Sequence, residues 1–293
     1  MDIIVADDEP VTRLLLEESL SSWGYHVHAV DNGEQVLALL KEKPDLQLLL
    51  IDWSMPGLNG IELCRQIKAN TSLVKYVVML TGKSGTDCLV QAMEAGADDF
   101  LTKPFIPEEL KVRIRAGCRI IEQERLLQSY ANFDAMTGIW NRRMILCHLA
   151  SELSRARREL SNLVVCILDL DHFKKINDTF GHQTGDEVLQ YFSHIVKKQI
   201  RPYDYFGRYG GEEFLLIIPK LPQSDSLCVV ERIKTAVSKA ELRRENQPPI
   251  QFTVSIGITI ANHHDDNIEE VIKRADMAAY NAKHSGRNKV VLM

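Results

Sequence analysis

The sequence of 293 residues predicts an α/β protein made of two units that a long helix connects. Three observations lead to this prediction. Short apolar runs alternate with amphipathic stretches over residues 1–105, residues 107–131 contain almost no helix breaker, and residues 132–293 return to alternating runs in a different order. A chain of this length can bury two separate cores, so two domains are expected.

The first unit, residues 1–120, is predicted to be a doubly wound, five-stranded parallel sheet. Its strand-like runs are "IIVA", "YHVHAV", "LQLLLI", "YVVML" and "FLTKP", and stretches such as "EQVLALL" between them read as helices. Strands that alternate with helices form a parallel sheet covered on both faces. In such folds the functional side chains gather at the carboxyl ends of the strands.

The helix predicted over residues 107–131 has two interpretations. Its apolar residues form only a partial stripe, made by Leu110, Ile114, Ile121 and Leu127. In one interpretation it is the last helix of the first unit and packs on that unit's sheet. In the other it continues outward as a paired stalk, and the polar second half favours this interpretation.

The second unit, residues 132–293, is predicted to be an α+β sheet with helices on one side. Its strand-like runs are "NLVVCILDLD", the hairpin "YFGRYGGEEFLLIIP", "IQFTVSIGITI" and "NKVVLM". Its helix-like runs are "GDEVLQYFSHIVKKQI", "DSLCVVERIKTAVSKA" and "EEVIKRADMAAYNAKHSG". The mixture of a hairpin with helical crossovers is the reason for the α+β assignment.

Composition excludes several classes of protein. The 45% hydrophobic and 26% charged residues are typical of a globular protein, and the net charge of −5 comes without a long run of either sign, so neither a nucleic acid polymer nor a membrane is an expected partner. The six cysteines contain no CxxC pair and no metal-ligand spacing. The opening "MDIIVADDEP" is unlike a signal peptide, so a cytoplasmic protein is expected.

Acidic side chains follow two strands of the first unit. Asp7 and Asp8 come after the first strand, and Asp52 comes after the third. Three carboxylates so close repel one another, and a bound divalent cation relieves this repulsion. We therefore expect Mg²⁺ held by Asp8, Asp52 and a backbone carbonyl, with Asp52 as the nucleophile toward a phosphoryl donor.

Thr81 and Lys103 follow the fourth and fifth strands and are expected in the same pocket. Lys103 brings a mobile positive charge, and the Thr81 hydroxyl is placed to bond a phosphoryl oxygen. The Lys103–Pro104 bond is a candidate cis peptide. Singly, each residue has an ordinary alternative, such as a helix cap for the Asp7–Asp8 pair.

Residues 1–120 strongly resemble the receiver domain of bacterial response regulators, through "VADDEP", "LLLIDWSMPGLNG", "VVMLTG" and "DDFLTKPF". The resemblance implies that Asp52 is the phospho-acceptor, beside one Mg²⁺, and that a sensor histidine kinase or another phosphodonor acts upstream. Asp7, Asp8 and the carbonyl of Ser54 are implied as ligands of the metal, and Thr81 and Lys103 as sensors of the phosphoryl group. Phe100 matches the aromatic switch position, although an aromatic residue in the last strand is by default a core residue.

The stretch "RYGGEEFLLIIP" places Glu212 and Glu213 between a glycine turn and a buried strand. Asp169 ends a strand expected beside this hairpin, so the three carboxylates would meet. Carboxylates around magnesium can hold a nucleoside triphosphate, and glycines let the backbone approach its phosphates. Glu212 is the better metal ligand, and Glu213 either shares the metal or pairs with a base such as Lys283 or Arg287. The alternative is an exposed acidic hairpin tip.

Asn177 and Asp186 flank a glycine-rich turn that leads into a helix. A carboxylate accepts hydrogen bonds from N1 and the amino group of guanine, and adenine offers no such pair of donors. Such a pocket rejects ATP because buried polar groups would be left unpaired. The ordinary alternative is that both residues cap helices.

Residues 130–293 resemble the GGDEF family of diguanylate cyclases, through "DAMTGIWNRR", "DLDHFKKINDTFGHQTGDEVL", "RYGGEEF", "TVSIGI" and "ADMAAYNAKHSGRNKV". The resemblance implies condensation of two GTP into cyclic di-GMP with release of two pyrophosphates. It implies that Glu212 and Glu213 take part in catalysis. Two Mg²⁺ ions would be held by Asp169, the Leu170 carbonyl, Glu212 and Glu213. GTP would be bound by Asn177, His182, Asp186, Lys283 and Arg287.

Two residues depart from the family pattern. Glu212 stands where the family name has Asp, and Met136 stands where Leu is usual. Glutamate keeps the charge, and Met for Leu is a mild change in a core, so we expect activity to survive both.

Arg201 and Asp204, in "RPYD", match the Arg-x-x-Asp pair that forms an inhibitory product site in active members of this family. Arginine forks suit the phosphates of cyclic di-GMP, and Arg232 of a neighbouring domain is a candidate third contact. The alternative is a local salt bridge worth under about 1 kcal/mol.

One cyclase domain holds one GTP, so two domains must face each other and a homodimer is expected. Phosphorylation of Asp52 would align the two sites through the stalk. The main alternative is a catalytically inactive module that binds cyclic di-GMP or GTP. A receiver that drives DNA binding is the third class, and the sequence lacks a basic recognition helix.

Overall fold

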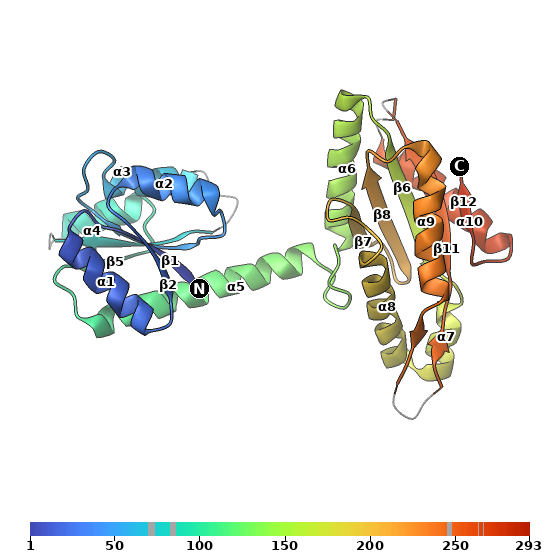
Figure 1. Cartoon of the computed structure of the whole chain (residues 1–293), viewed down its shortest axis with the longest axis horizontal. Coiled ribbons are helices and arrows are strands. Elements are labelled where there is room, and N and C mark those ends of the chain that lie inside the picture. The colour runs from blue at the N-terminus through green and yellow to red at the C-terminus, as the bar shows by residue number, and fades with distance from the viewer. Residues whose placement is uncertain (70–73, 83–85, 245–247, 263, 266) are drawn as a thin grey trace. The chain divides into compact units, whose positions relative to one another are not determined.

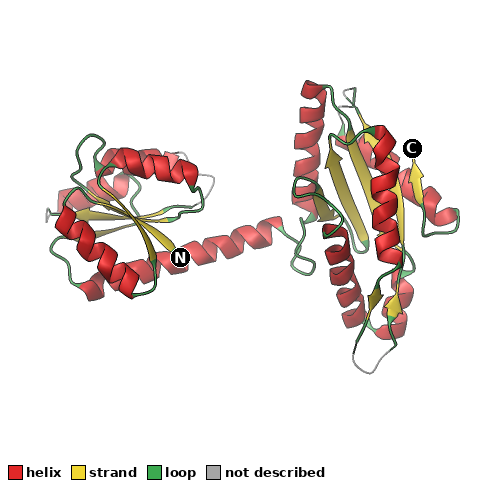
Figure 2. Ribbon diagram, in the orientation of Figure 1, coloured by secondary structure: helices red, strands yellow, loops and turns green. Residues whose placement is uncertain are grey.

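The computed structural model describes residues 1–69, 74–82, 86–244, 248–262, 264–265 and 267–293 (Figure 1). The chain forms two compact units, residues 1–128 and 129–293, and each contains its own sheet and helices (Figure 2).

The first unit contains a parallel sheet with the strand order β2-β1-β3-β4-β5. Every pair of neighbouring strands is parallel, which confirms the predicted topology. The strands are β1 (Asp2–Ala6), β2 (His26–Val30), β3 (Leu48–Asp52), β4 (Tyr76–Thr81) and β5 (Asp99–Thr102).

Helices cover both faces of this sheet because its strands are apolar on both sides. One core joins Ile4 to α2, α3 and α4, and the other joins Ile3 to α1 and α5. Successive strand residues point to opposite faces, so both cores are supplied by the same strands. The helices are α1 (Pro10–Ser22), α2 (Gly33–Glu42), α3 (Gly60–Ala69), α4 (Thr86–Glu94) and α5 (Pro107–Asn132).

Helix α5 combines features of both predicted interpretations. Its first half packs on the sheet through Leu110, Ile114 and Ile121. A Cβ atom on Gly117 would lie 2.6 Å from the ring of Tyr76, so the glycine permits this close packing. The second half exposes apolar side chains, among them Leu127, and its pairing as a stalk stays a prediction. None of the helices in the described ranges has the length and hydropathy of a transmembrane span.

The second unit contains a five-stranded sheet with the order β12-β11-β6-β8-β7. The predicted hairpin is present as β7 and β8, and β12 lies parallel to β11 while the other pairs are antiparallel. The strands are β6 (Leu163–Leu170), β7 (Tyr205–Arg208), β8 (Glu213–Pro219), β11 (Val254–Ala261) and β12 (Val290–Leu292), and a separate ribbon is formed by β9 (Glu241–Leu242) and β10 (Ile250–Gln251).

The prediction that helices lie on one side of this sheet is wrong. Cys166 packs with α7, α8 and α9, whereas Val165 packs with α6 and α10 on the opposite face. All residues of β6 are buried, which is typical of a strand covered on both faces. Two of the helices, α6 and α7, were not predicted. The helices are α6 (Arg142–Glu159), α7 (Phe173–Phe180), α8 (His182–Lys197), α9 (Gln223–Ser238) and α10 (Ile268–His284).

Candidate functional site

The first acidic site lies at the carboxyl ends of β1 and β3. The ligand oxygens of Asp7, Asp8 and Asp52 all lie within 4.8 Å of one another. Asp7 and Asp52 are buried and Asp8 is exposed, so the cluster can be reached from solvent. Oxygen ligands from several carboxylates with an open side suit Mg²⁺, which retains part of its water shell.

Lys103 lies between two of these carboxylates. Its Nζ is 2.6 Å from Asp7 Oδ2 and 2.5 Å from Asp52 Oδ1. The Lys103–Pro104 peptide bond is cis, which confirms that prediction. The other Asp52 oxygen accepts a hydrogen bond of 3.0 Å from the backbone N–H of Ser54. Asp52 is therefore held from two sides.

The charges in this pocket do not cancel. Burial raises the pKa of Asp52, although Lys103 opposes the shift. Burial alone would lower the pKa of Lys103, but its hydrogen bonds to Asp52 and Asp7 raise the pKa overall. One lysine faces three carboxylates, so an excess of negative charge remains that favours a divalent cation.

Thr81 and Phe100 lie on the neighbouring strands. Thr81 is buried at the end of β4, and its carbonyl accepts a hydrogen bond of 2.7 Å from the N–H of Lys103. Phe100 is half-buried on β5, packs against the core, and has the Arg113 guanidinium 5.8 Å from its ring centroid. The structure thus connects Thr81 to the pocket through the backbone of Lys103.

The second acidic site is formed by β6 and the β7–β8 hairpin. Asp169 pairs with Glu213 in the antiparallel register, and the N–H of Leu170 donates to the carbonyl of Glu212 at 3.3 Å. Asp169 is buried, whereas Glu212 and Glu213 are half-buried. The strand and the hairpin are therefore neighbours. In contrast to the first site, these three carboxylates do not all lie within 4.8 Å of one another.

Lys283 of α10 forms an ion pair with Asp169 Oδ2. The other oxygen, Oδ1, is buried and has no hydrogen-bond partner in the described part of the chain. Burial raises the pKa of Asp169 to about 6, which Lys283 opposes and the two glutamates reinforce. Burial also raises the pKa of Glu212. An unpaired buried oxygen is costly, so the donor set fits a bound Mg²⁺.

Glu213 does not pair with Lys283, which contacts Asp169 instead. The exposed Arg287 follows α10 in a left-handed backbone conformation with φ of 55°. A Cβ atom on Gly210 would lie 2.6 Å from Glu213 Oε2. Gly210 therefore leaves room for the Glu213 carboxylate.

Arg208 of β7 holds the glycine turn, a role that was not predicted from the sequence. Its Nε donates to the carbonyl oxygens of Gly210 at 3.2 Å and Gly211 at 3.1 Å, and its Nη2 donates to Gly211 at 2.7 Å. Its Nη1 lies 3.3 Å from Asp134 Oδ2. The position of this arginine, two residues before Gly210 and Gly211, was the only sequence feature that could have indicated the role. Arg208 therefore fixes the turn that carries Glu212.

The expected guanine pair lies on α7 and α8. Asn177 Oδ1 is buried and has no hydrogen-bond partner among the described residues. A Cβ atom on Gly185 would lie only 1.8 Å from this oxygen. Asp186 and His182 are exposed on α8. Because His172 and Gly181 are the cap residues of α7, and Gly181 precedes α8, neither Asn177 nor Asp186 caps a helix at its start.

Asp171 is a second buried acid that the sequence analysis missed. Its carboxylate accepts hydrogen bonds from Thr253 Oγ1 at 2.7 Å, Ser255 Oγ at 2.6 Å and the N–H of Asn288 at 2.9 Å. Asp171 therefore connects the end of β6 to β11 and to the loop after α10. The pattern "DLD" was its only signal.

Arg201 and Asp204 form a turn before β7, at the opposite end of that strand from the glycine turn. Asp204 Oδ2 accepts a hydrogen bond of 2.7 Å from the backbone N–H of Arg201, whose side chain bonds the Tyr203 hydroxyl at 3.1 Å. Burial raises the pKa of Asp204, and Arg201 and Arg232 oppose the shift. Arg232 Nη2 donates to the Gln199 carbonyl at 2.8 Å. The turn is therefore held by a hydrogen bond from the Arg201 backbone to the Asp204 carboxylate and not by a salt bridge between their side chains.

Comparison with known proteins identifies both units. Residues 131–289 match the family model "Diguanylate cyclase, GGDEF domain", and residues 3–115 match "Response regulator receiver domain". Response regulator PleD of Caulobacter vibrioides is 37% identical over 99% of this chain, which spans 65% of PleD. Diguanylate cyclase DosC of Escherichia coli is 38% identical over 58% of this chain and 36% of its own length.

Solved structures give the same result for the second unit. The GGDEF domain of DgcB from Caulobacter crescentus in complex with c-di-GMP has a TM-score of 0.53 and 35% identity, over 55% of this chain and 93% of that one. The coiled coil and GGDEF domain of DgcB have a TM-score of 0.59 and 30% identity, over 64% and 98%. The chain therefore belongs to the diguanylate cyclase GGDEF family and carries a response regulator receiver domain.

Proposed function

We propose that the protein condenses two GTP molecules into cyclic di-GMP and releases two pyrophosphates, under the control of receiver phosphorylation. The observation that carries this proposal is Asp169, a buried carboxylate with one unpaired oxygen beside two further acids and Lys283. Membership in the GGDEF family and the identity to DosC support the same activity.

The residues that would hold Mg²⁺ in the cyclase site are Asp169, the Leu170 carbonyl, Glu212 and Glu213, around two ions. Bound Mg²⁺ supplies charge stabilisation for in-line attack at the α-phosphorus. Lys283 forms an ion pair with Asp169 in the structure, and with Mg²⁺ held at Asp169 its ammonium group would be free to contact the triphosphate. Arg287, next to it in the chain, is the second proposed phosphate contact.

Asn177, His182 and Asp186 are proposed to select guanine. The unpaired Asn177 Oδ1 can accept a hydrogen bond from the base, and the exposed Asp186 carboxylate can accept from N1 and the amino group. ATP would leave these acceptors unpaired, so its use is expected to be much slower.

We infer that the active enzyme is a homodimer, because each domain binds one GTP and the two nucleotides react with each other. The exposed apolar residues Leu126, Leu127 and Tyr130 at the end of α5 support this segment as the pairing region. The similarity to a DgcB structure that contains a coiled coil supports it as well. Phosphorylation of Asp52, next to Mg²⁺ at Asp7 and Asp8, would change the pairing and align the cyclase domains.

We further propose that cyclic di-GMP inhibits the enzyme at Arg201 and Asp204, with Arg232 from a neighbouring domain. The Arg201 side chain is exposed, and Asp204 carries a buried oxygen without a described partner. Titration of cyclic di-GMP into an Arg201→Ala variant tests this site, since the variant should keep its initial rate and lose inhibition. Equal inhibition of the variant and the parent contradicts the proposal.

The activity is tested by incubation of the protein with GTP and Mg²⁺ and by measurement of cyclic di-GMP and pyrophosphate. Both products should form, faster with beryllofluoride as a mimic of the phosphoryl group, and Glu212→Gln should abolish them. Bound cyclic di-GMP without turnover would instead identify an inactive binding module. Equal rates with and without beryllofluoride would contradict control by the receiver.

A further inference from the structure

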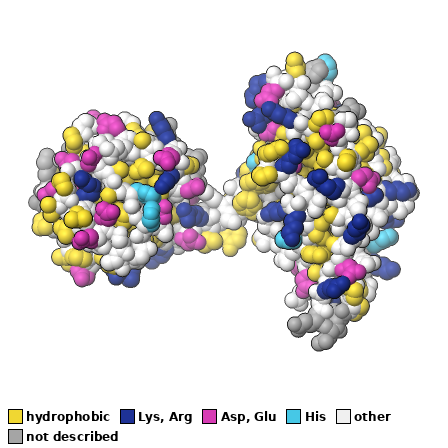
Figure 3. Space-filling model, in the orientation of Figure 1, with side chains coloured by type: hydrophobic (Ala, Val, Ile, Leu, Met, Phe, Trp, Pro, Cys, Tyr) yellow, Lys and Arg dark blue, Asp and Glu magenta, His cyan; other side chains and the backbone are white. Residues whose placement is uncertain are grey.

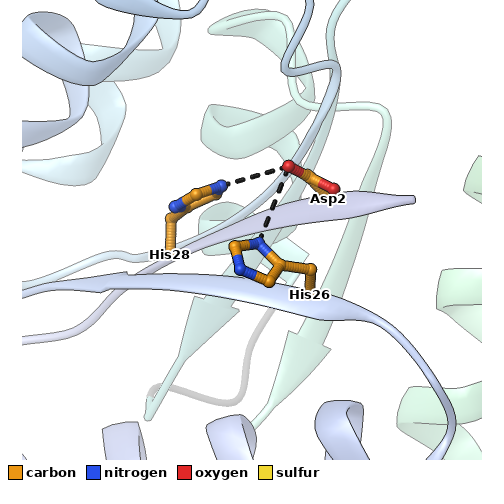
Figure 4. Close-up of side chains that lie close together, drawn as sticks. All are labelled: Asp2, His26 and His28. Carbon is orange, nitrogen blue, oxygen red and sulfur yellow. Dashed lines mark hydrogen bonds and ion pairs between the residues drawn. The ribbon is translucent and has the colours of Figure 1, made fainter.

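We propose that Asp2, His26 and His28 form a binding site for a divalent transition-metal ion such as Zn²⁺. The three side chains come from the neighbouring strands β1 and β2 (Figure 4). Their ligand atoms all lie within 4.8 Å of one another. Asp2 begins β1 and His26 begins β2, so this site lies at the opposite end of these strands from Asp7.

The backbone places the three side chains together. Asp2 is the register partner of His26 in the parallel pair β1–β2, and His28 is two residues further along β2. Residues two apart in a strand point to the same face, so both imidazoles face the same side of the sheet as the carboxylate. The N–H of His26 donates to the carbonyl of Met1 at 3.2 Å, which holds the beginnings of the two strands together.

The separations of the ligand atoms agree with a shared ion. Asp2 Oδ2 lies 3.6 Å from His26 Nδ1 and 3.3 Å from His28 Nε2. Zn–N and Zn–O bonds of about 2.0–2.2 Å in a tetrahedral site put neighbouring ligand atoms about 3.3–3.5 Å apart. In the structure Asp2 Oδ2 forms an ion pair with His26 Nδ1 and a hydrogen bond with His28 Nε2 (Figure 4), and both contacts are longer than charge-assisted hydrogen bonds of about 2.7–2.9 Å. An ion bound between the three groups would replace these two long contacts.

The ligand types and the exposure select the class of ion. Two imidazole nitrogens with one carboxylate suit Zn²⁺ and similar ions, whereas Mg²⁺ and Ca²⁺ prefer oxygen ligands. The His26 side chain is 70% exposed and that of His28 is 12% exposed, so the site is open on one side. His26 and His28 are the only histidines in the sequence of residues 1–128, and histidine side chains are visible on the surface of that unit (Figure 3). A water molecule can complete four-fold coordination.

The test uses the full chain without a polyhistidine tag, with Mg²⁺ in excess to saturate the acidic pockets. Zn²⁺ is titrated in competition with a fluorescent zinc chelator. One ion per chain should bind at this site, and His26→Gln and His28→Gln should each weaken that binding by about tenfold or more. The matched control is His194→Gln, an exposed histidine on α8, which should bind Zn²⁺ as the parent does.

Co²⁺ gives a second measurement, because tetrahedral Co²⁺ absorbs visible light strongly. The absorption should appear with the parent protein and be lost in His26→Gln. Unchanged Zn²⁺ affinity in His26→Gln, or equal loss in His194→Gln, would overturn the proposal. The largely exposed His26 decides the outcome if the more buried His28 variant fails to fold, and neither measurement depends on cyclase activity.

Discussion

The two acidic sites of this chain use the same components in different arrangements. Each has carboxylates at strand ends and one lysine, Lys103 in the receiver and Lys283 in the cyclase unit. In the receiver, neighbouring parallel strands bring three carboxylates within 4.8 Å, and the lysine contacts two of them. In the cyclase unit the acids come from a strand and a hairpin turn, stand further apart, and the lysine contacts only Asp169.

This difference shows what each site needs from its ligand. Both Asp52 oxygens have partners in the structure, so the receiver pocket is assembled before a cation or a phosphoryl group arrives. One Asp169 oxygen has no partner among the described residues, so we expect a ligand to complete the cyclase pocket. We therefore expect the cyclase site to depend more steeply on its metal ligands than the receiver pocket does.

The largest effect is expected from Asp169→Asn, which removes the buried carboxylate proposed as a metal ligand and should lower cyclic di-GMP formation by at least about 100-fold. The rate of product formation with saturating GTP and Mg²⁺ measures it. Asp276→Asn is the matched control, since it makes the same change at an exposed position on α10 and should leave the rate unchanged. A rate within a few-fold of the parent would remove Asp169 from the metal site.

Gly185→Ala should raise the KM for GTP by about 30-fold. Its Cβ atom would lie 1.8 Å from Asn177 Oδ1, so Asn177 must move away from the base, at a cost of about 2 kcal/mol. The test is a double-mutant cycle. If the clash with Asn177 is the cause, Gly185→Ala should add little in an Asn177→Ala background, and additive effects of the two changes would contradict this explanation.

Asp52→Asn should remove the stimulation of cyclase activity by phosphodonors, a factor of about tenfold, and leave the unstimulated rate intact. The measurement compares rates with and without acetyl phosphate. Asp45→Asn, at an exposed position of the same unit, should retain the stimulation. A variant that still responds to acetyl phosphate would show that the receiver pocket does not control the cyclase.

The smallest effect concerns pH. Burial raises the pKa of Asp169 to about 6, so at pH 6 the Asp169 carboxyl is protonated in about half of the molecules. This proton would compete with Mg²⁺ for the carboxylate. The Mg²⁺ affinity of the cyclase site, measured by calorimetry in the Asp52→Asn background, should be about twofold lower at pH 6 than at pH 8. Lys283→Met removes a charge that lowers this pKa, so its profile should move to higher pH, and coincident profiles would contradict the assignment.

Much of the fold could be predicted because it follows from local patterns. Apolar runs such as "LQLLLI" gave the strands, and Gly210 and Gly211 gave the hairpin. The helices on the second face of the cyclase sheet were not predicted. A continuous apolar run such as that of β6 does not by itself identify the helices that pack on each face of the strand.

The sites could be predicted less completely, because their contacts join distant parts of the chain. The ion pair of Lys283 with Asp169 spans 114 residues, and no local pattern distinguishes it from a pair with Glu213. The same is true of Arg208, whose acidic partner Asp134 is 74 residues away. Strand ends predict which carboxylates gather, whereas the partner of each lysine depends on the tertiary structure.

The ion pair between Lys283 and Asp169 has a consequence for how the protein is kept and assayed. A lysine already offsets the charge of the most buried carboxylate in the cyclase site, so folding of this unit should not require a metal. Preparations treated with a chelator should remain folded and regain activity when magnesium is returned. Magnesium supply would then limit turnover without affecting the lifetime of the enzyme.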